Sequence, residues 1–253
     1  MYARYVAIGD SSTEGLDDPD GAGGWRGWAD RLAEHVARTS PGLEYANLAV
    51  RGRLAGQVRR EQLDRALELR PDLVTAFAGV NDLLRPGYDR AAVLADLEAV
   101  LGALTATGAT VLTITMPDPS RVMPLVRPLK ARVAGFNAGV RGVAARTGAR
   151  VADVGAHAVG GDPRLWSDDR LHANPLGHER IAAALAATLQ LPGTDDSWAQ
   201  PLPPVLRRPP HELARAEAVW LRTHFTPWVR RRLRGESSGD AVVPKRPEYR
   251  PVG

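Results

Sequence analysis

RYVAIGDS, residues 4–11, is the stretch of sequence that decides the fold. Its first five residues, Arg4–Ile8, are apolar enough to form a buried β-strand. Gly9 and Asp10 follow directly, and a glycine at this position permits the tight turn that exposes a side chain at the edge of a sheet. The sequence therefore predicts a first strand whose end presents Ser11.

Outward from this strand, short apolar runs alternate with longer stretches of helical periodicity. The runs that predict further strands are Leu43–Val50, Asp72–Ala78, Thr110–Met116 and Arg150–Val154. The stretches that predict helices are Trp25–Ala37, Leu54–Leu69, Ala91–Thr107, Leu129–Thr147 and a last one that begins at Asn174-Pro175 and continues over Ile181–Leu191. Five strands with helices between them predict a domain over residues 1–191, with a three-layer α/β/α fold around a five-stranded parallel sheet.

Residues 192–253, called the C-terminal extension below, differ from this predicted domain in composition. Residues 201–253 hold 11 Lys/Arg and 5 Asp/Glu, a net charge of +6, whereas residues 1–200 carry −2 because 24 Asp/Glu exceed 22 Lys/Arg. Repeated prolines stiffen the start of the extension. We expect a helix over His211–Thr223, interrupted at Pro227, and a mobile Gly/Ser/Pro-rich segment over 235–253.

Composition excludes several classes of protein. The chain contains no cysteine, so disulfides, thiolate catalysis and thiolate metal sites are ruled out. No run approaches the roughly 20 apolar residues that cross a bilayer, and the N-terminus reads as a strand rather than a signal peptide. We therefore expect a cytoplasmic protein without a transmembrane segment, whose oligomeric state the sequence leaves open.

Residues that can carry chemistry follow four of the predicted strands. Ser11 comes after the first strand, Gly52 after the second and Asn81 after the third, while Asp169 and His172 lie beyond the fifth. The carboxyl ends of parallel strands meet at one edge of a sheet, where ligands bind. We therefore expect these five residues to converge on one site.

Their residue types match the needs of a serine nucleophile. A serine hydroxyl attacks effectively when an oriented base takes its proton and preorganised donors stabilise the oxyanion. Ser11 offers the hydroxyl, and the segment Asp169–His172 places a carboxylate three residues before an imidazole. The Asn81 side chain and the Gly52 N–H could serve as donors. Each group alone also has an ordinary explanation, as a turn, a helix entry or a solvated histidine.

Taken together, the four groups resemble the motif blocks of the SGNH (GDSL-type) hydrolase superfamily. The matching blocks, in the order of the family, are Gly9-Asp10-Ser11 with Gly15, then Gly52, then Gly79-Val80-Asn81-Asp82, and finally Asp169-Arg170-Leu171-His172. The resemblance covers about residues 3–190 and departs at Ser12, where leucine is common. The basic extension also resembles that of cytoplasmic family members from actinobacteria.

This resemblance implies a flavodoxin-like SGNH hydrolase fold and an esterase or lipase-like acylhydrolase. It implies that Ser11 is the nucleophile, that His172 acts as general base and then acid, and that Asp169 orients His172. It also implies an oxyanion hole built from the Ser11 and Gly52 N–H groups and the Asn81 side chain. The expected partner is a small-molecule acyl ester, and the bond could be a carboxylic ester, a thioester or a sugar acetate.

Several alternatives stay open at this point. Asp168 could replace Asp169 as the orienting carboxylate, and Ser12 could replace Ser11 as the nucleophile. His178, on the helix that follows, is expected to be structural. No His/Asp/Glu cluster with ligand spacing is evident, so we expect no metal and no cofactor. The residues predicted to line the substrate pocket are Trp25, Leu83, Leu84 and Met123.

A different function would use the extension itself. Its basic charge and its tryptophans, Trp198, Trp220 and Trp228, could form a module that binds anionic lipid or nucleic acid. The ordinary alternative is that the tryptophans pack the extension onto the body of the protein while the arginines are solvated. We favour packing and expect no nucleic-acid partner.

Overall fold

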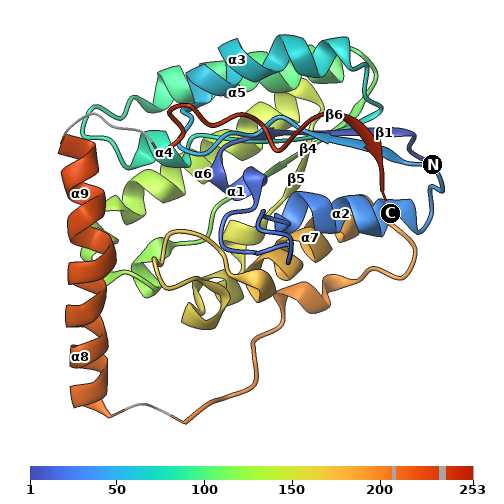
Figure 1. Cartoon of the computed structure of the whole chain (residues 1–253). Coiled ribbons are helices and arrows are strands. Elements are labelled where there is room, and N and C mark those ends of the chain that lie inside the picture. The colour runs from blue at the N-terminus through green and yellow to red at the C-terminus, as the bar shows by residue number, and fades with distance from the viewer. Residues whose placement is uncertain (207–208, 234–237, 253) are drawn as a thin grey trace.

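The computed structural model describes residues 1–206, 209–233 and 238–252 and is built on a six-stranded sheet (Figure 1). The strands are β1 (Arg4–Gly9), β2 (Glu44–Asn47), β3 (Leu73–Phe77), β4 (Thr110–Ile114), β5 (Arg150–Ala152) and β6 (Arg246–Pro251). The α-helices are α1 (Ser11–Glu14), α2 (Gly27–Ala37), α3 (Ala55–Glu68), α4 (Val80–Leu83), α5 (Arg90–Thr105), α6 (Lys130–Thr147), α7 (Pro175–Thr188), α8 (Pro210–Trp220) and α9 (Thr226–Leu233). Shorter 3₁₀ turns are η1 (Pro119–Arg121), η2 (Pro124–Leu129), η3 (Val154–Ala156), η4 (Ala158–Gly161), η5 (Pro163–Leu165) and η6 (Asp196–Ala199), and η7 (Leu221–Phe225) is a π-helical turn.

β1 lies at the centre of the sheet, whose strand order is β5-β4-β3-β1-β2-β6. It pairs in parallel with β3 on one side and with β2 on the other. Its residues Tyr5–Ile8 are completely buried, as expected for a continuous apolar run covered on both faces. The direction in which strands are added reverses at β1, so the carboxyl ends of β1 and β3 are where a ligand is expected to bind.

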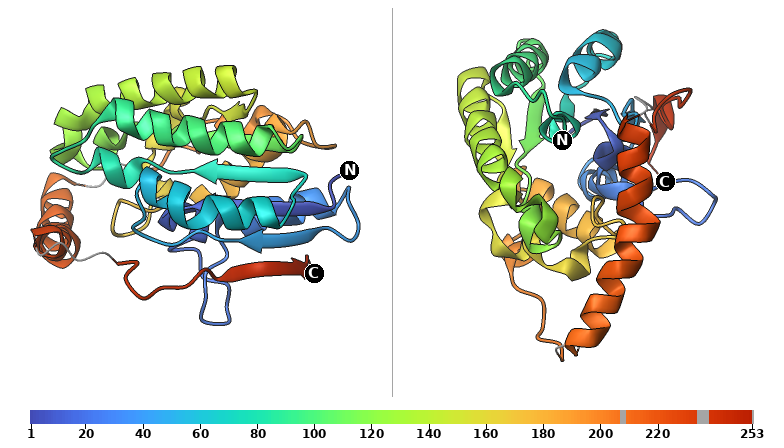
Figure 2. Two further views of the ribbon diagram at one scale, coloured as in Figure 1. Left: turned by 90° about the horizontal axis from the view of Figure 1, so that it is seen from above. Right: turned by 90° about the vertical axis from the view of Figure 1, so that its left-hand side faces the viewer.

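Two layers of helices cover the sheet, with α3, α5 and α6 on one face and α2 and α7 on the other (Figures 1 and 2). In α2 the buried residues Trp28, Leu32 and Val36 recur at four-residue spacing, which produces the apolar stripe that the sequence predicted. The predicted start of α7 is confirmed, since the Asn174 side chain accepts the Gly177 N–H at 3.0 Å and Pro175 follows it.

The predicted count of five strands was one short. β6 pairs antiparallel with β2, although the sequence assigns these residues to a mobile end. Its two prolines and its charged residues break the sequence pattern that is typical of a strand. Such a segment can still form a strand here because prolines are tolerated at the edge of a sheet. Side-chain contacts hold it, with the Tyr249 hydroxyl donating to the Leu69 carbonyl at 3.1 Å and the Arg246 guanidinium 5.1 Å from the Tyr45 ring centroid.

Within the rest of the C-terminal extension, α8, η7 and α9 form a helical rod across the carboxyl edge of the sheet (Figure 1, left). The helix predicted over residues 211–223 is present as α8 and η7, but Pro227 does not end it. Pro227 instead lies in the first turn of α9, directly after the π-helical turn η7. The part of the predicted mobile end at residues 235–237 and 253 lies outside the described residues. Over the part of the chain that the structure describes, no helix combines the length and apolar character that a membrane span needs.

Lys245 fastens the segment before β6 to the start of α2. Its Nζ donates to the carbonyl oxygens of Trp25 at 2.9 Å and Arg26 at 2.7 Å, and it pairs with Asp30 at 2.9 Å. Burial lowers the pKa of the Lys245 ammonium, against the opposing charge and hydrogen bond of Asp30. The extension is therefore tied down by a cation that has little contact with water.

We expect Lys245→Ala to lower the free energy of unfolding by about 1–3 kcal/mol, because the substitution leaves Asp30 without its cation and two carbonyl groups without their donor. Lys130→Ala serves as the control, since the Lys130 side chain is 71% exposed and lies 3.5 Å from Asp118. Its loss is expected to cost less than about 0.5 kcal/mol. Urea unfolding measures the loss of stability in each variant, and equal losses in the two variants would contradict an anchoring role for Lys245.

Candidate active site

The turn after β1 is fixed by buried contacts around Gly9. The Gln62 side chain accepts the Gly9 N–H at 2.8 Å and donates to the Gly9 carbonyl at 2.9 Å. A Cβ atom at Gly9 would lie 2.3 Å from the Phe77 carbonyl oxygen, so a larger residue does not fit. The chain therefore leaves the sheet in one defined direction, and Ser11 becomes the first residue of α1.

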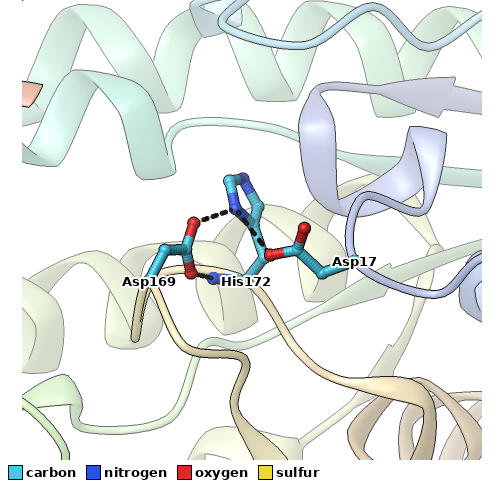
Figure 3. A group of neighbouring side chains, drawn as sticks. All are labelled: Asp17, Asp169 and His172. Carbon is cyan, nitrogen blue, oxygen red and sulfur yellow. Dashed lines mark hydrogen bonds and ion pairs between the residues drawn. The ribbon is translucent and has the colours of Figure 1, made fainter. Parts of the chain in front are cut away.

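Ser11, His172 and Asp169 form a continuous chain of hydrogen bonds. The Ser11 Oγ lies 2.9 Å from the His172 Nε2, and the His172 Nδ1 lies 2.7 Å from the Asp169 Oδ2 (Figure 3 shows the pair). The other Asp169 oxygen accepts the backbone N–H groups of Leu171 at 2.8 Å and His172 at 3.0 Å. The structure thus brings together three predicted site residues. The Asp169 carboxylate is oriented by the N–H groups of Leu171 and His172, which follow it in the same turn.

Electrostatics decide where the imidazole proton resides. Burial by itself would raise the pKa of Asp169, but the hydrogen bonds and charge of His172 hold that pKa well below its usual range. The carboxylate is therefore only an acceptor, which places a proton on the His172 Nδ1 and leaves the Nε2 lone pair facing the Ser11 hydroxyl. Burial works to lower the pKa of His172, yet the hydrogen bond and charge of Asp169 outweigh it, and this pKa lies above its ordinary value.

Asp17 is a second carboxylate beside His172 that the sequence analysis missed. Its Oδ2 lies 3.8 Å from the His172 Nδ1 (Figure 3). The Ser167 hydroxyl lies 2.6 Å from this oxygen and 2.7 Å from the Asp169 Oδ1. Because one hydroxyl carries one proton, the two carboxylates compete for it. Asp17 adopts a left-handed backbone with φ of 67°, and no motif spacing links it to His172.

Asp17, Asp169 and His172 also bring together atoms of the kind that bind a metal ion. Their ligand atoms all lie within 4.8 Å of one another, a grouping that the sequence did not predict. The 2.7 Å between the His172 Nδ1 and the Asp169 Oδ2 is a hydrogen-bond distance, with a proton between the two atoms. The observed arrangement is therefore that of an oriented imidazole.

Asn81 reaches the same region from α4, directly after β3. Its Nδ2 donates to the Asp10 Oδ2 and to the Arg53 carbonyl, both at 3.2 Å. The other oxygen of Asp10 accepts the Ser12 N–H at 3.1 Å and so caps α1. Asp10 is fully buried, and this burial raises its pKa to about 6. Asp10 therefore links the turn that carries Ser11 to the amide of Asn81.

Gly52 lies in the turn between β2 and α3 and has a left-handed backbone, with φ of 76°. Glu14, in α1, holds this turn by accepting the Arg51 N–H at 2.8 Å and by pairing with the Arg51 guanidinium. Among the described residues that line the cavity beside Ser11, Gly52 is absent. The structure therefore places Gly52 near the serine turn through Glu14 but outside the cavity wall.

Ser11, Asn81 and His172 line one cavity of about 1280 Å³, its open mouth included. The remaining walls are mostly apolar and come from the ends of β3 and β4, from η2 and α6, and from the turns η4 and η5. Their residues include Phe77, Ile114, Val126, Val133, Val159 and Leu165. Of the predicted pocket residues, Leu83, Leu84 and Met123 line this cavity and Trp25 does not.

The alternative site residues take different partners. The Ser12 hydroxyl accepts from the Trp28 Nε1 at 3.2 Å, while the His172 ring is hydrogen-bonded to Ser11 and Asp169. These contacts favour Ser11 over Ser12 as the nucleophile and Asp169 over Asp168 as the orienting carboxylate.

His178 is buried at the start of α7 and has a structural set of partners. Its Nδ1 accepts the Trp28 N–H at 3.0 Å, and its Nε2 donates to the Leu16 carbonyl at 2.9 Å. Burial holds the pKa of His178 well below its ordinary value. A neutral His178 therefore joins α7 to α2 and to the loop after α1.

We expect an NMR-detected pH titration to place the pKa of His172 above the ordinary value of about 6.5 and the pKa of His178 well below it. Asp169→Asn should lower the pKa of His172 by more than Asp17→Asn does, because Asp169 contributes both a hydrogen bond and the closer charge. Equal shifts from the two substitutions would contradict this difference.

Comparisons with known proteins agree with the fold. LAE5, an alpha/beta hydrolase enzyme from the metagenome of Lake Arreo, Spain, is 22% identical, with a TM-score of 0.63 over 75% of this chain and 95% of its own. A catalytic mutant of Axe2, an acetylxylan esterase from Geobacillus stearothermophilus, is 17% identical, with a TM-score of 0.64 over 78% of this chain and 96% of its own. The acetyl xylan esterase AlAXEase is 19% identical, with a TM-score of 0.61 over 74% of this chain and 99% of its own. No curated protein matches the sequence.

A family match covers more than half of the chain. Residues 7–180 match the GDSL-like Lipase/Acylhydrolase family, a range that contains Ser11, Gly52, Asn81, Asp169 and His172. This chain therefore belongs to the GDSL-like lipase/acylhydrolase family and is a carboxylic ester hydrolase.

Proposed function

We propose that the protein hydrolyses esters of apolar acyl groups through an acyl-enzyme on Ser11. The observation that carries this proposal is the hydrogen-bonded chain from the Ser11 Oγ through His172 to Asp169, placed at the wall of an apolar cavity. The chain supplies a nucleophile, a base with a free lone pair and an orienting carboxylate. The cavity supplies room for the acyl group.

In the first half of the reaction the Ser11 Oγ attacks the ester carbonyl carbon, and the His172 Nε2 takes the hydroxyl proton. Asp169 keeps the Nδ1–H in place and stabilises the imidazolium that forms. Collapse of the tetrahedral intermediate breaks the bond to the alcohol oxygen, which receives the proton from the His172 Nε2. The products of this half are the free alcohol and the acyl-enzyme.

The second half repeats these steps with water as the nucleophile. The His172 Nε2 takes a proton from a water molecule that attacks the acyl carbon, and then returns a proton to the Ser11 oxygen as the acid leaves. Both halves require a neutral His172 at the start. Because the pKa of His172 is raised, activity is expected to fall as the pH drops through a value above the ordinary one.

The negative charge on the carbonyl oxygen needs donors that are held in place beforehand. The donors that we propose at the cavity wall are the Ser11 N–H, at the start of α1, and the Asn81 Nδ2. We propose the Gly52 N–H as a third donor, from the turn beside the wall that Glu14 holds against α1. The Asn81 amide is held by Asp10 in this structure. Binding of the oxyanion would therefore exchange one hydrogen bond of Asn81 for another.

The acyl group is proposed to be apolar and longer than acetyl. The wall of the cavity offers aliphatic side chains, among them Ile114, Val126 and Val133, which suit an apolar chain. Two of the similar structures are acetylxylan esterases by name, yet at 17% and 19% identity they support a shared fold rather than a shared substrate.

The alternative function, a binding module for lipid or nucleic acid, needs tryptophans at the surface of the extension. Trp198 and Trp220 are only 8% and 5% exposed, and Trp228 is half-buried. Their burial supports the packing role that the sequence analysis favoured, and no specific observation supports the alternative.

We expect p-nitrophenyl octanoate to have a kcat/KM at least about tenfold above that of the acetate, because several buried methylene groups each add binding energy. Ser11→Ala should lower kcat by roughly 10⁴-fold or more, and a fluorophosphonate should label the native protein but not this variant. Spectrophotometric release of p-nitrophenol measures the rates. An absence of both hydrolysis and labelling would refute the mechanism, whereas a preference for acetate would refute only the apolar acyl group.

We expect Asn81→Ala to lower kcat by roughly 10²–10³-fold while KM changes little, since an oxyanion donor acts in the transition state. Gln200→Ala, which removes an exposed amide, is the control and should leave kcat unchanged. Thermal melting of both variants checks folding, because Asn81 also binds Asp10 and Arg53. A folded Asn81→Ala variant with normal kcat would rule out this donor.

A further inference from the structure

The C-terminal extension builds a second cavity next to the one that Ser11 lines. The rod formed by α8, η7 and α9 lies after residue 180, where the family match ends. It stands across the carboxyl edge of the sheet (Figures 1 and 2). A cavity of about 750 Å³, its open mouth included, lies between this rod and the body of the protein.

Three contacts fix α8 against the turn that carries Asp169. The Trp220 Nε1 donates to the Asp169 carbonyl oxygen at 3.2 Å. The Arg170 guanidinium lies 4.5 Å from the centroid of the Trp220 ring and pairs with Glu217 at 2.6 Å. Trp220 is also 5% exposed. The extension is therefore seated directly on the segment that orients His172.

An aromatic row forms the outer wall of this second cavity. The ring centroids of Trp220 and Phe225 are 5.5 Å apart, and those of Phe225 and Trp228 are 6.2 Å apart. The π-helical turn η7 lies between them, and its wider spacing puts residues five apart, such as Trp220 and Phe225, on one face. The three rings thus line up along the rod.

The inner wall is shared with the first cavity. Leu84, Met123, Val126 and Leu171 line both cavities. No lysine or arginine lines the second one among the described residues, and its polar lining residues are Asp169, Thr223 and His224. Its aromatic and aliphatic walls suit an uncharged, apolar group.

The chemistry of ester hydrolysis indicates which part of the substrate the second cavity would hold. An ester has an acyl side and an alcohol side, and the first cavity takes the acyl side in the proposed function. The alcohol oxygen must lie within reach of the His172 Nε2 to receive its proton. Leu171, next to His172 in the chain, belongs to the shared wall.

We propose that the second cavity binds the apolar alcohol part of the substrate, so that the substrate is an ester with apolar groups on both sides of the cleaved bond. This inference rests on the proposed function. It makes the extension, with Trp220, Phe225 and Trp228, a part of the substrate site.

The first test uses the native protein with methyl, butyl and octyl butyrate, and titration of the released acid gives the rates. The acyl group is constant in this series, so a change reports on the alcohol side alone. We expect KM to fall at least about tenfold from the methyl to the octyl ester, because each buried methylene group adds binding energy. Hydrolysis of all three esters with the same KM would overturn the inference and leave the proposed function standing. Failure to hydrolyse any of them, or any p-nitrophenyl ester, would refute the proposed function itself.

The second test fills the cavity. Thr223 lines it and Arg222 does not, and both are exposed positions in η7. Thr223→Trp should lower the ratio of kcat/KM for octyl over methyl butyrate by about tenfold, while the control Arg222→Trp should leave this ratio unchanged. A similar loss in both variants, or a change in the dependence on acyl length instead, would overturn the inference. Thermal melting checks that both variants fold, and the ester series on the native protein decides the matter if one does not.

Discussion

Complete burial of β1 is the constraint on which the rest of the molecule depends. A strand that is covered on both faces and paired along both edges can present chemistry only where it ends, since its side chains are occupied by packing. Gln62 from α3 holds the end of β1 at Gly9 through two hydrogen bonds. A helix that covers one face of the sheet therefore sets the direction in which the chain leaves β1. The position of Ser11 therefore depends on the whole sheet, and a change in packing between α3 and β1 would reach the Ser11 hydroxyl through Gln62.

Each group at the site has a polar neighbour that holds it in place. Asp10 connects the serine turn to Asn81, and Glu14 connects it to the turn that contains Gly52. Asp17 and Ser167 lie beside the carboxylate that orients the imidazole. Such contacts hold donors and acceptors at fixed distances before a substrate arrives, which is how a protein stabilises a developing charge without reorganising.

The parts of the fold that repeat were predictable from the sequence, and the parts held by single distant contacts were not. The apolar run of β1 and the stripe of α2 follow from burial that recurs at strand or helix spacing. The grouping of Ser11, Asn81, Asp169 and His172 was predictable from their positions after the strands and from the resemblance to a known family, whereas Gly52 lies outside the cavity wall. Asp17 was missed because its approach to His172 depends on a left-handed turn without a local signature. β6 was missed because its prolines and arginines show no strand pattern, and because Lys245 and Tyr249 hold it through partners far away in the sequence.

The pairing of β6 with β2 also has a consequence for synthesis on the ribosome. The two strands are separated by roughly 200 residues, the kind of long-range contact that delays folding. At a translation rate of about 5–20 residues per second, the outer edge of β2 waits roughly 10–40 s for its partner. During that interval the nascent sheet has an open edge, which is the feature that invites pairing with other chains. The window for aggregation of this protein is therefore set by elongation rate, and binding of a chaperone to the Glu44–Asn47 edge during those seconds would protect the growing chain.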